Sequence, residues 1–148
     1  MAAANQRVGA YQRVDIETAS QGKLIVMLFN GAIKRAEEAK RQIEKRSLPE
    51  AHRHLIRAQE IIGELRGALN MNAGEIAQDL DRIYEYLQHL LISANLRKSS
   101  EPIDQCVEFM TSLRDTWREV FDAVAREQAA APAPSINQHG NSVLNLRG

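Results

Sequence analysis

The chain of 148 residues carries 19 basic and 19 acidic side chains, so its formal net charge at pH 7 is zero. This length suits one domain with its own apolar core, and the balanced charge argues against a protein that holds nucleic acid or an anionic membrane through a basic surface. The single cysteine, Cys106, excludes an internal disulfide, and residues 1–6 lack the apolar segment of a secretory signal. These features predict a cytoplasmic protein.

Residues 1–17 come before the first regular apolar pattern. Scattered apolar side chains of this kind are too few to form a core helix, and we expect the segment to be an N-terminal strap docked on the domain. The apolar residues are Val8, Tyr11, Val14 and Ile16.

The first predicted helix covers residues 18–46. Its apolar residues recur at steps of three and four, which is the period of one buried helix face. They are Ile25, Leu28, Ala32, Ala36, Ala39 and Ile43. The uninterrupted apolar run from Leu24 to Phe29 is far shorter than the roughly 20 residues that cross a bilayer as a helix. It therefore belongs to a helix of a globular domain and not to a membrane anchor.

Three further helices are predicted over residues 48–71, 75–97 and 101–128, each with the same alternation of three- and four-residue steps. We call the row of apolar residues that each helix is expected to bury its seam. In the helix over residues 75–97 the seam is Ile76, Leu80, Ile83, Leu87, Leu90 and Ala94. Pro49 and Pro102 stand near two of the helix starts, where a missing backbone N–H breaks no hydrogen bond. Brief connections force neighbouring helices to run antiparallel. The sequence thus predicts an all-α protein, an antiparallel up-down-up-down four-helix bundle over residues 18–128.

The last segment, residues 129–148, is rich in Ala, Pro, Asn and Gln. It has little apolar surface to bury, and its composition predicts a disordered C-terminal tail. Val143, Leu144 and Leu146 form an apolar cluster in this tail. A local apolar contact site there is the alternative to complete disorder.

A search for catalytic or metal-binding patterns finds no residues with suitable spacing. A di-iron site in a bundle needs inward carboxylates and Glu-x-x-His pairs, but the predicted seams hold aliphatic residues with Cys106, Met110 and Trp117. His52 and His54 are two residues apart on a helix, so their side chains point about 200° apart. We expect no metal, no cofactor and no catalytic residue, and the chain is predicted not to be an enzyme.

One catalytic alternative remains open. The segment HLIRA, residues 54–58, resembles the neighbourhood of the phosphorylated histidine in histidine phosphotransfer domains, which are also four-helix bundles. Against this interpretation, Arg57 stands where that pattern has Lys, and Ala58 stands where it has Gly. A histidine such as His54 on a solvated helix face also needs no special role.

Apolar side chains outside the predicted seams are the more informative feature. They are Leu24, Val26, Met27, Phe29, Tyr84, Tyr86, Leu91, Ile92, Val107, Phe109 and Phe121. One interpretation is a wide core with a few singly exposed residues. The other is a groove or belt that binds an apolar, helical or disordered segment of another protein, or that closes on a second copy as a homodimer.

Two blocks of the sequence resemble the flagellar secretion chaperone FliS family. In residues 18–39 the matching positions are Thr18, Ala19, Ser20, Leu24, Ile25, Met27, Leu28, Gly31, Ala32 and Ile33. In residues 61–87 they are Ile62, Glu64, Leu65, Leu69, Asn70, Gly74, Glu75, Ile76, Ala77, Leu80, Tyr84 and Tyr86. The pattern continues in order through Ala94, Asn95, Leu113, Arg114 and Trp117.

The resemblance implies a cytosolic export chaperone with a four-helix bundle. Such proteins bind the disordered C-terminal segment of newly made flagellin, hold it unpolymerised and help deliver it to the flagellar type III export gate. In that family an N-terminal strap, whose tyrosine corresponds to Tyr11, covers part of the client surface when no client is bound. A bundle adaptor for another helical partner is the remaining alternative. The predicted client contacts are Tyr11, Leu24, Met27, Leu28, Phe29, Tyr84, Leu91 and Phe121.

Three positions depart from the family pattern. Gln21 replaces the proline near the start of the first helix, Phe29 replaces a tyrosine and Asn30 replaces an acidic residue. Without the proline, Thr18 and Gln21 form a capping-box pattern that places the helix start near Thr18. The hydroxyl missing at Phe29 and the charge missing at Asn30 put any hydrogen bond made there in doubt.

Overall fold

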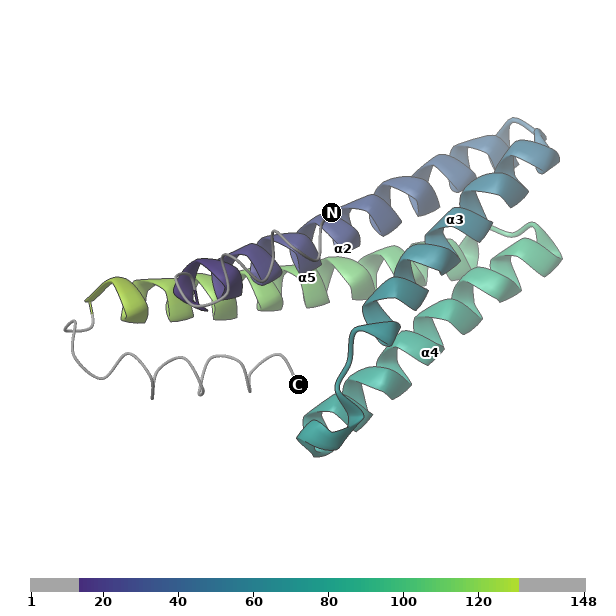
Figure 1. Cartoon of the computed structure of the whole chain (residues 1–148). Coiled ribbons are helices and arrows are strands. Elements are labelled where there is room, and N and C mark those ends of the chain that lie inside the picture. The colour runs from purple at the N-terminus through teal and green to yellow at the C-terminus, as the bar shows by residue number, and fades with distance from the viewer. Residues whose placement is uncertain (1–13, 131–148) are drawn as a thin grey trace, which may run out of the picture.

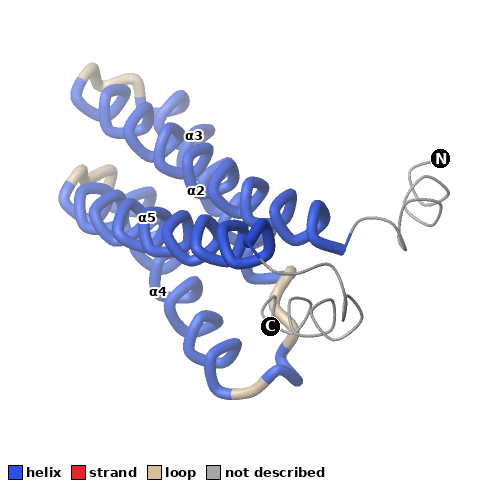
Figure 2. The backbone as a smooth tube through the Cα atoms, turned by 90° about the vertical axis from the view of Figure 1, so that its left-hand side faces the viewer, coloured by secondary structure: helices blue, strands red, loops and turns tan. Residues whose placement is uncertain are grey.

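The computed structural model describes the backbone of residues 14–130 and the side chains of residues 21–72 and 74–130. All regular secondary structure in this part of the chain is helical, which confirms the predicted all-α class (Figure 2). The predicted bounds of the strap and of the tail were wrong where they are described, because residues 14–17 belong to the first helix and residues 129–130 to the last. The rest of the strap, residues 1–13, and of the tail, residues 131–148, lies outside the described residues. The elements are α2 (Val14–Glu44), α3 (Leu48–Gly67), the short 3₁₀ helix η1 (Met71–Ala73), α4 (Glu75–Arg97) and α5 (Glu101–Ala130).

The four long helices pack side by side, each antiparallel to the next, as a four-helix bundle (Figure 1). α2 contacts α3 and α5, and α4 contacts the same two helices, so α2 and α4 lie diagonally opposite each other. The predicted bundle is therefore confirmed. Toward the end at which α2 begins, the α2–α5 pair and the α3–α4 pair separate from each other (Figures 1 and 2).

The core fills the part of the bundle nearer the connection between α2 and α3. Its largest fully buried side chains are Phe29, Leu55, Ile62, Leu87, Leu91, Ile103, Met110 and Cys106. Ala32, Ala36 and Ala39 on α2 are also buried, and these small residues leave room for larger side chains from the facing helices. Among the described residues of α5, none after Met110 is buried. The four-helix core therefore ends where the two pairs separate.

The first long helix starts earlier than the sequence indicated. α2 begins at Val14, so Thr18 lies inside the helix and the capping-box prediction is wrong. The reason lies at Gln21, because a proline in the middle of α2 would remove a backbone hydrogen bond and clash with the preceding turn, whereas glutamine lets the helix run through. The structure also ends α3 at Gly67 and α5 at Ala130, where residues 71 and 128 were expected.

Two connections use a left-handed residue that is not glycine. Arg46, between α2 and α3, has φ 65°, and Lys98, which ends α4, has φ 48°. The backbone N–H of Arg46 donates to the carbonyl oxygen of Ile43 at 3.0 Å, and that of Lys98 donates to the carbonyl oxygen of Ala94. Both residues close the helix in the way that glycine usually does.

Replacing Arg46 by glycine is therefore expected to stabilise the protein by about 0.5–1 kcal/mol, because glycine removes the steric cost of a Cβ in the left-handed region. Lys98→Gly should gain less, because it also loses the hydrogen bonds from Lys98 Nζ to the carbonyl oxygen and Oδ1 of Asn95. Urea unfolding measures the change. The control is Lys34→Gly inside α2, where glycine should cost about 1 kcal/mol. A loss of stability in Arg46→Gly would contradict the expectation.

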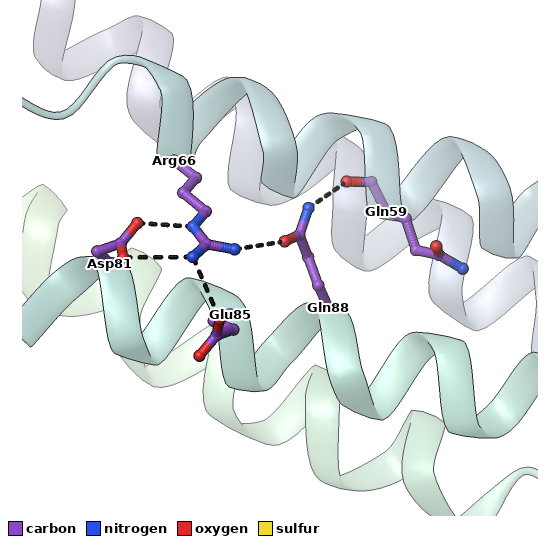
Figure 3. Close-up of polar contacts among 5 residues, drawn as sticks. All are labelled: Gln59, Arg66, Asp81, Glu85 and Gln88. Atoms are coloured by element: carbon purple, nitrogen blue, oxygen red, sulfur yellow. Dashed lines mark hydrogen bonds and ion pairs between the residues drawn. The ribbon is translucent and has the colours of Figure 1, made fainter.

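A polar network joins α3 to α4 (Figure 3). Arg66 on α3 donates from Nε to Asp81 Oδ1 at 2.6 Å and from Nη2 to Glu85 Oε2 at 3.3 Å. Its Nη1 donates to Gln88 Oε1 at 3.2 Å, and Gln88 Nε2 in turn donates to the carbonyl oxygen of Gln59 on α3. The network adds polar contacts between α3 and α4 beside the buried core residues Leu65 and Tyr84.

The hydrogen bond from Arg66 holds the pKa of Asp81 below its ordinary value of 3.8. A lowered carboxyl pKa contributes stability above the unfolded value, and that contribution is lost as the pH falls through the lower value of the folded chain. Asp81→Asn should thus lower the melting temperature by a few degrees at pH 7, and the difference from the parent should shrink as the pH falls below about 4.

Asp79→Asn is the matched control for this pH dependence. Asp79 lies on the same helix as Asp81, but its ion-pair partner Arg82 is one turn away on α4, and both side chains are largely exposed. An exposed pair within one helix contributes little, so this variant should melt close to the parent at every pH. Melting curves that are equal for the two variants would refute the assignment of a helix-joining role to Arg66 and Asp81.

Candidate binding surface

A groove of about 420 Å³ lies between α2 and α5 in the part of the bundle beyond the four-helix core. Aliphatic and aromatic side chains form much of its lining, and two basic residues and one acidic residue complete it. The lining residues are Gly22, Lys23, Val26 and Met27 from α2, and Arg118, Phe121, Asp122 and Ala125 from α5. A groove of this size and composition suits a short apolar segment of a peptide.

Close packing of Gly22 against Phe121 creates one wall of the groove. A Cβ atom added to Gly22 would lie 2.5 Å from Cγ and 2.8 Å from Cβ of Phe121, so only glycine fits at this distance. The Phe121 ring stacks on the Trp117 indole with centroids 5.3 Å apart and planes at 20°. Gly22 therefore sets how near α5 lies to α2, and Trp117 fixes the orientation of Phe121.

Two large apolar side chains beside the groove are exposed. Met27, which lines it, is 66% exposed, and Leu24 on the preceding turn of α2 is 53% exposed. Residues three apart on a helix are neighbours on its surface, so Leu24 extends the apolar surface beyond Met27. The apolar face of α5 is also incompletely covered, since Leu113 and Trp117 are half-buried and Val120 is 41% exposed.

One polar contact fixes the register of α2 against α5 at the core end of this surface. Nη1 of Arg114 donates to Oδ1 of Asn30 at 3.0 Å. Asn30 stands where the family pattern has an acidic residue, and its amide oxygen accepts this hydrogen bond without a charge. Asn30 therefore makes a hydrogen bond to α5 although it carries no charge.

Three of the predicted client contacts are core residues, and their placement toward the flanks of the bundle was wrong. Phe29 and Leu91 are 0% exposed and Tyr84 is 2% exposed. Phe29 packs against Tyr84 with ring centroids 6.2 Å apart. Burial also raises the pKa of Tyr84 to about 12. The bundle encloses the Phe29 ring completely, so a client cannot reach this position. The absence of a tyrosine hydroxyl there therefore removes no contact with a client.

The remaining predicted contacts divide into three groups. Met27 and Phe121 line the groove, and Leu24 is exposed beside it. Leu28 is half-buried and packs against the core. Tyr11 lies outside the described residues.

The sequence reasoning missed Gly22 and Ala125 as parts of the groove. Neither residue presents an apolar side chain large enough to enter a count of surplus apolar surface. A weak signal was present for Gly22, because glycine inside a helix is unfavourable and often marks a close approach of another chain segment. The glycine alone does not show which segment comes close. The structure shows that this segment is α5, through Phe121.

The described residues contain no group of three or more His, Cys, Asp or Glu side chains that could hold a metal ion. Cys106 is buried in the core, where its Sγ lies 3.8 Å from the carbonyl oxygen of Leu87. Burial raises the pKa of its thiol to about 12. Because the thiolate is the reactive form, this thiol has little nucleophilic character at neutral pH.

His54 is half-buried and interacts with a cation from α2. Nη1 of Arg35 lies 3.1 Å from Nδ1 of His54. Since a guanidinium can only donate, Nδ1 is the acceptor and the proton of a neutral ring lies on Nε2. The contact with Arg35 gives His54 a structural partner, and no described residue beside it points to phosphotransfer.

Within residues 14–130, none of the helices combines the length and apolar composition required to cross a membrane. What the described chain presents instead is a helical bundle with a side groove, exposed apolar flanks and mixed charges at the rim. The fold and the site thus define the class of helical bundles with an apolar side groove, a feature typical of binding modules. Within this class, residues 3–124 match the model of the family described as flagellar protein FliS, and the chain belongs to that family.

Individual relatives agree with the family match. The flagellar secretion chaperone FliS of Bacillus subtilis (strain 168) is 30% identical over 119 residues, which cover 80% of this chain and 89% of the relative. The flagellar secretion chaperone FliSB of Pseudomonas aeruginosa is 33% identical over 112 residues, which cover 72% and 89%. FliS of Salmonella typhimurium is 29% identical over 119 residues, which cover 76% and 88%. The resemblance found in the two sequence blocks is confirmed, and the family is one of flagellar secretion chaperones.

Proposed function

We propose that this chain is a cytoplasmic, non-enzymatic export chaperone that binds the disordered C-terminal segment of flagellin. It holds the client unpolymerised and delivers it, as a loaded complex, to the gate of the flagellar type III export apparatus. Membership of a flagellar chaperone family supports the general role. The groove between α2 and α5, with Met27 exposed in it, is the observation that carries the assignment of the site.

The chemistry of the groove fits a segment that becomes ordered on binding. Such a segment loses conformational entropy when it binds, so it gains affinity from many apolar contacts spread along an extended path. Phe121 and Met27 supply apolar contacts inside the groove, and Leu24 extends them along α2. Lys23 and Asp122 at the rim remain available for polar groups of the client backbone. We therefore assign the primary client contacts to Leu24, Met27 and Phe121, with Leu28 beneath them and Tyr11 as a further contact.

Calorimetric titration with a peptide from the C-terminus of the cognate flagellin tests this proposal. The full chain is expected to bind at micromolar concentration or better, and Met27→Asp is expected to weaken binding at least tenfold, because it places a charge in the apolar groove. The matched control is Leu96→Asp, since Leu96 is 82% exposed near the opposite end of the bundle. That variant should bind like the parent.

Two outcomes would overturn the proposal. Absence of binding to the peptide at micromolar concentration would exclude flagellin as the client and favour an adaptor for another partner. Equal weakening by Met27→Asp and Leu96→Asp would show that the groove is not the site. A flagellin polymerisation assay adds an independent readout, because the parent chaperone should delay filament growth in proportion to its concentration and Met27→Asp should not.

A further inference from the structure

We propose that the C-terminal segment of this same chain, residues 135–147, docks in the groove between α2 and α5 and competes with the client. The groove is apolar and open in the described part of the chain, and no other described segment fills it. The occupant must therefore come from outside residues 14–130 or from another molecule. Position, reach and composition all favour the C-terminal segment.

Position is the first argument. α5 supplies half of the groove lining and ends at Ala130, so the chain leaves the helix close to the groove. From Phe121 to Ala130 the helix rises only about 14 Å at 1.5 Å per residue. The segment that follows is therefore tethered next to the surface it would cover.

Reach is the second argument. Leu144 stands fourteen residues after Ala130, and an extended chain of that length spans up to about 45 Å. This span exceeds the distance back along α5 to Phe121, so the segment can fold back without strain. A short tether of this kind gives an effective concentration in the millimolar range. A contact with a dissociation constant of about 0.1 mM would then be occupied about nine-tenths of the time.

Composition is the third argument. Beyond Ala130 the large apolar residues are Ile136, Val143, Leu144 and Leu146, and the others are mostly Ala, Pro, Ser, Asn, Gln and Gly. Three apolar residues within four positions can enter one groove together. Arg147 is the charged residue of this segment, and Asp122 is the carboxylate among the residues that line the groove. An Arg147–Asp122 pair would fix the direction of the docked segment.

The N-terminal residues 1–13 are a weaker candidate for the same groove. Their apolar side chains, Val8 and Tyr11, stand apart between Arg7 and Arg13. Two further positive charges beside Lys23 and Arg118 would repel one another at the rim, whereas the C-terminal segment adds a single positive charge.

Trp117 provides a direct test, because it is the single tryptophan of the chain and stacks on the groove residue Phe121. In the full chain, Leu144→Asp with Leu146→Asp should shift its emission to longer wavelength and increase quenching by acrylamide. Asn141→Asp with Asn145→Asp adds the same charge at neighbouring polar residues and should leave both readouts unchanged. Identical readouts for the parent and the two double variants would overturn the docking.

A disulfide between groove and tail gives a second, independent measurement. Ala125 lines the groove, so the Ala125→Cys, Leu144→Cys variant should form an intramolecular disulfide under mild oxidation, while the native Cys106 stays buried in the core. Glu119 is exposed on α5 outside the groove, so Glu119→Cys with Leu144→Cys should form it much more slowly. Equal rates for the two pairs would overturn the proposal.

Two alternative occupants give different outcomes. Trp117 emission that depends on protein concentration would identify a second copy as the occupant. A response to Tyr11→Asp without any response to the tail variants would identify the N-terminal segment. Either result overturns the proposed docking.

The competition with the client rests on the proposed function, whereas the docking does not. If the tail occupies the groove nine-tenths of the time, Leu144→Asp with Leu146→Asp should bind the flagellin peptide about tenfold more tightly than the parent. Docking seen by Trp117 without flagellin binding in any variant would support the tail contact and refute the proposed function. Flagellin binding with equal affinity in the parent and this variant would refute the competition.

Discussion

Leu91→Asp is expected to unfold the protein, whereas Leu24→Asp is expected to leave it folded and unable to hold its client. Leu91 is 0% exposed in the core and Leu24 is 53% exposed beside the groove. Truncating a buried leucine costs about 2–5 kcal/mol, and an unpaired carboxylate in the same place adds several more. The sum of these two costs approaches the free energy of unfolding of a typical domain, which is about 5–15 kcal/mol. The exposed position carries neither cost.

Circular dichroism and urea unfolding separate the two variants. Leu24→Asp should keep the parent's helical signal and midpoint while its affinity for the flagellin peptide falls, and Leu91→Asp should lose the cooperative transition. Leu96→Asp again serves as the exposed control, with parent-like stability and parent-like binding. A stable, cooperatively folded Leu91→Asp variant would contradict the placement of this side chain in the core.

The regular spacing of apolar residues was enough to predict the fold, because each helix buries one stripe and the connections are short. Asn70 and Gly74 shape the connection between α3 and α4 through local chemistry, since Oδ1 of Asn70 accepts from the N–H of Asn72 at 3.1 Å and Gly74 has φ 109°. These local signals act over a few residues. The turn that they predict therefore does not depend on how distant parts of the chain pack.

Spacing alone did not decide which apolar residues of α4 face the core. The predicted seam included Ile76 and Ile83, but Ile76 is exposed and Ile83 is half-buried, while Tyr84 and Leu91 are buried. Two sets of positions both satisfy the alternation of three and four: they share Leu80, Leu87 and Ala94 and differ at the members between, where Ile83 and Leu90 in one set are replaced by Tyr84 and Leu91 in the other. A helix that contacts two neighbours buries a stripe wide enough to include members of each set.

The groove was predictable only in part. Met27 and Phe121 stood out as apolar residues beyond the seams, and the structure places both in its lining. Gly22 did not stand out, because its role depends on the register of α2 against α5 and on a residue from the other end of the described chain. Such a long-range pairing leaves no periodic signal in the sequence.

Gly22→Ala is expected to destabilise the protein by about 1 kcal/mol, and at most by about 2 kcal/mol, although alanine is the better helix former. The substitution gains about 1 kcal/mol of helix propensity, but its Cβ would lie 2.5 Å from Cγ of Phe121. The contact involves atoms near the backbone of Phe121, so α2 and α5 must move apart and not merely reorient a flexible side chain. Overpacking of this kind costs about 1–3 kcal/mol, which exceeds the gain.

Gly31→Ala is the matched control on the same helix. A Cβ at Gly31 would lie 3.5 Å from Cδ1 of Ile61, an ordinary contact distance, so this variant should become more stable by up to about 1 kcal/mol. Urea unfolding should thus separate the two alanine variants by about 2 kcal/mol. Because movement of Phe121 disturbs its stacking on Trp117 and reshapes the groove, Gly22→Ala should also change the Trp117 emission and weaken flagellin binding, while Gly31→Ala changes neither. Equal stabilisation of both variants would show that α5 does not approach α2 at Gly22.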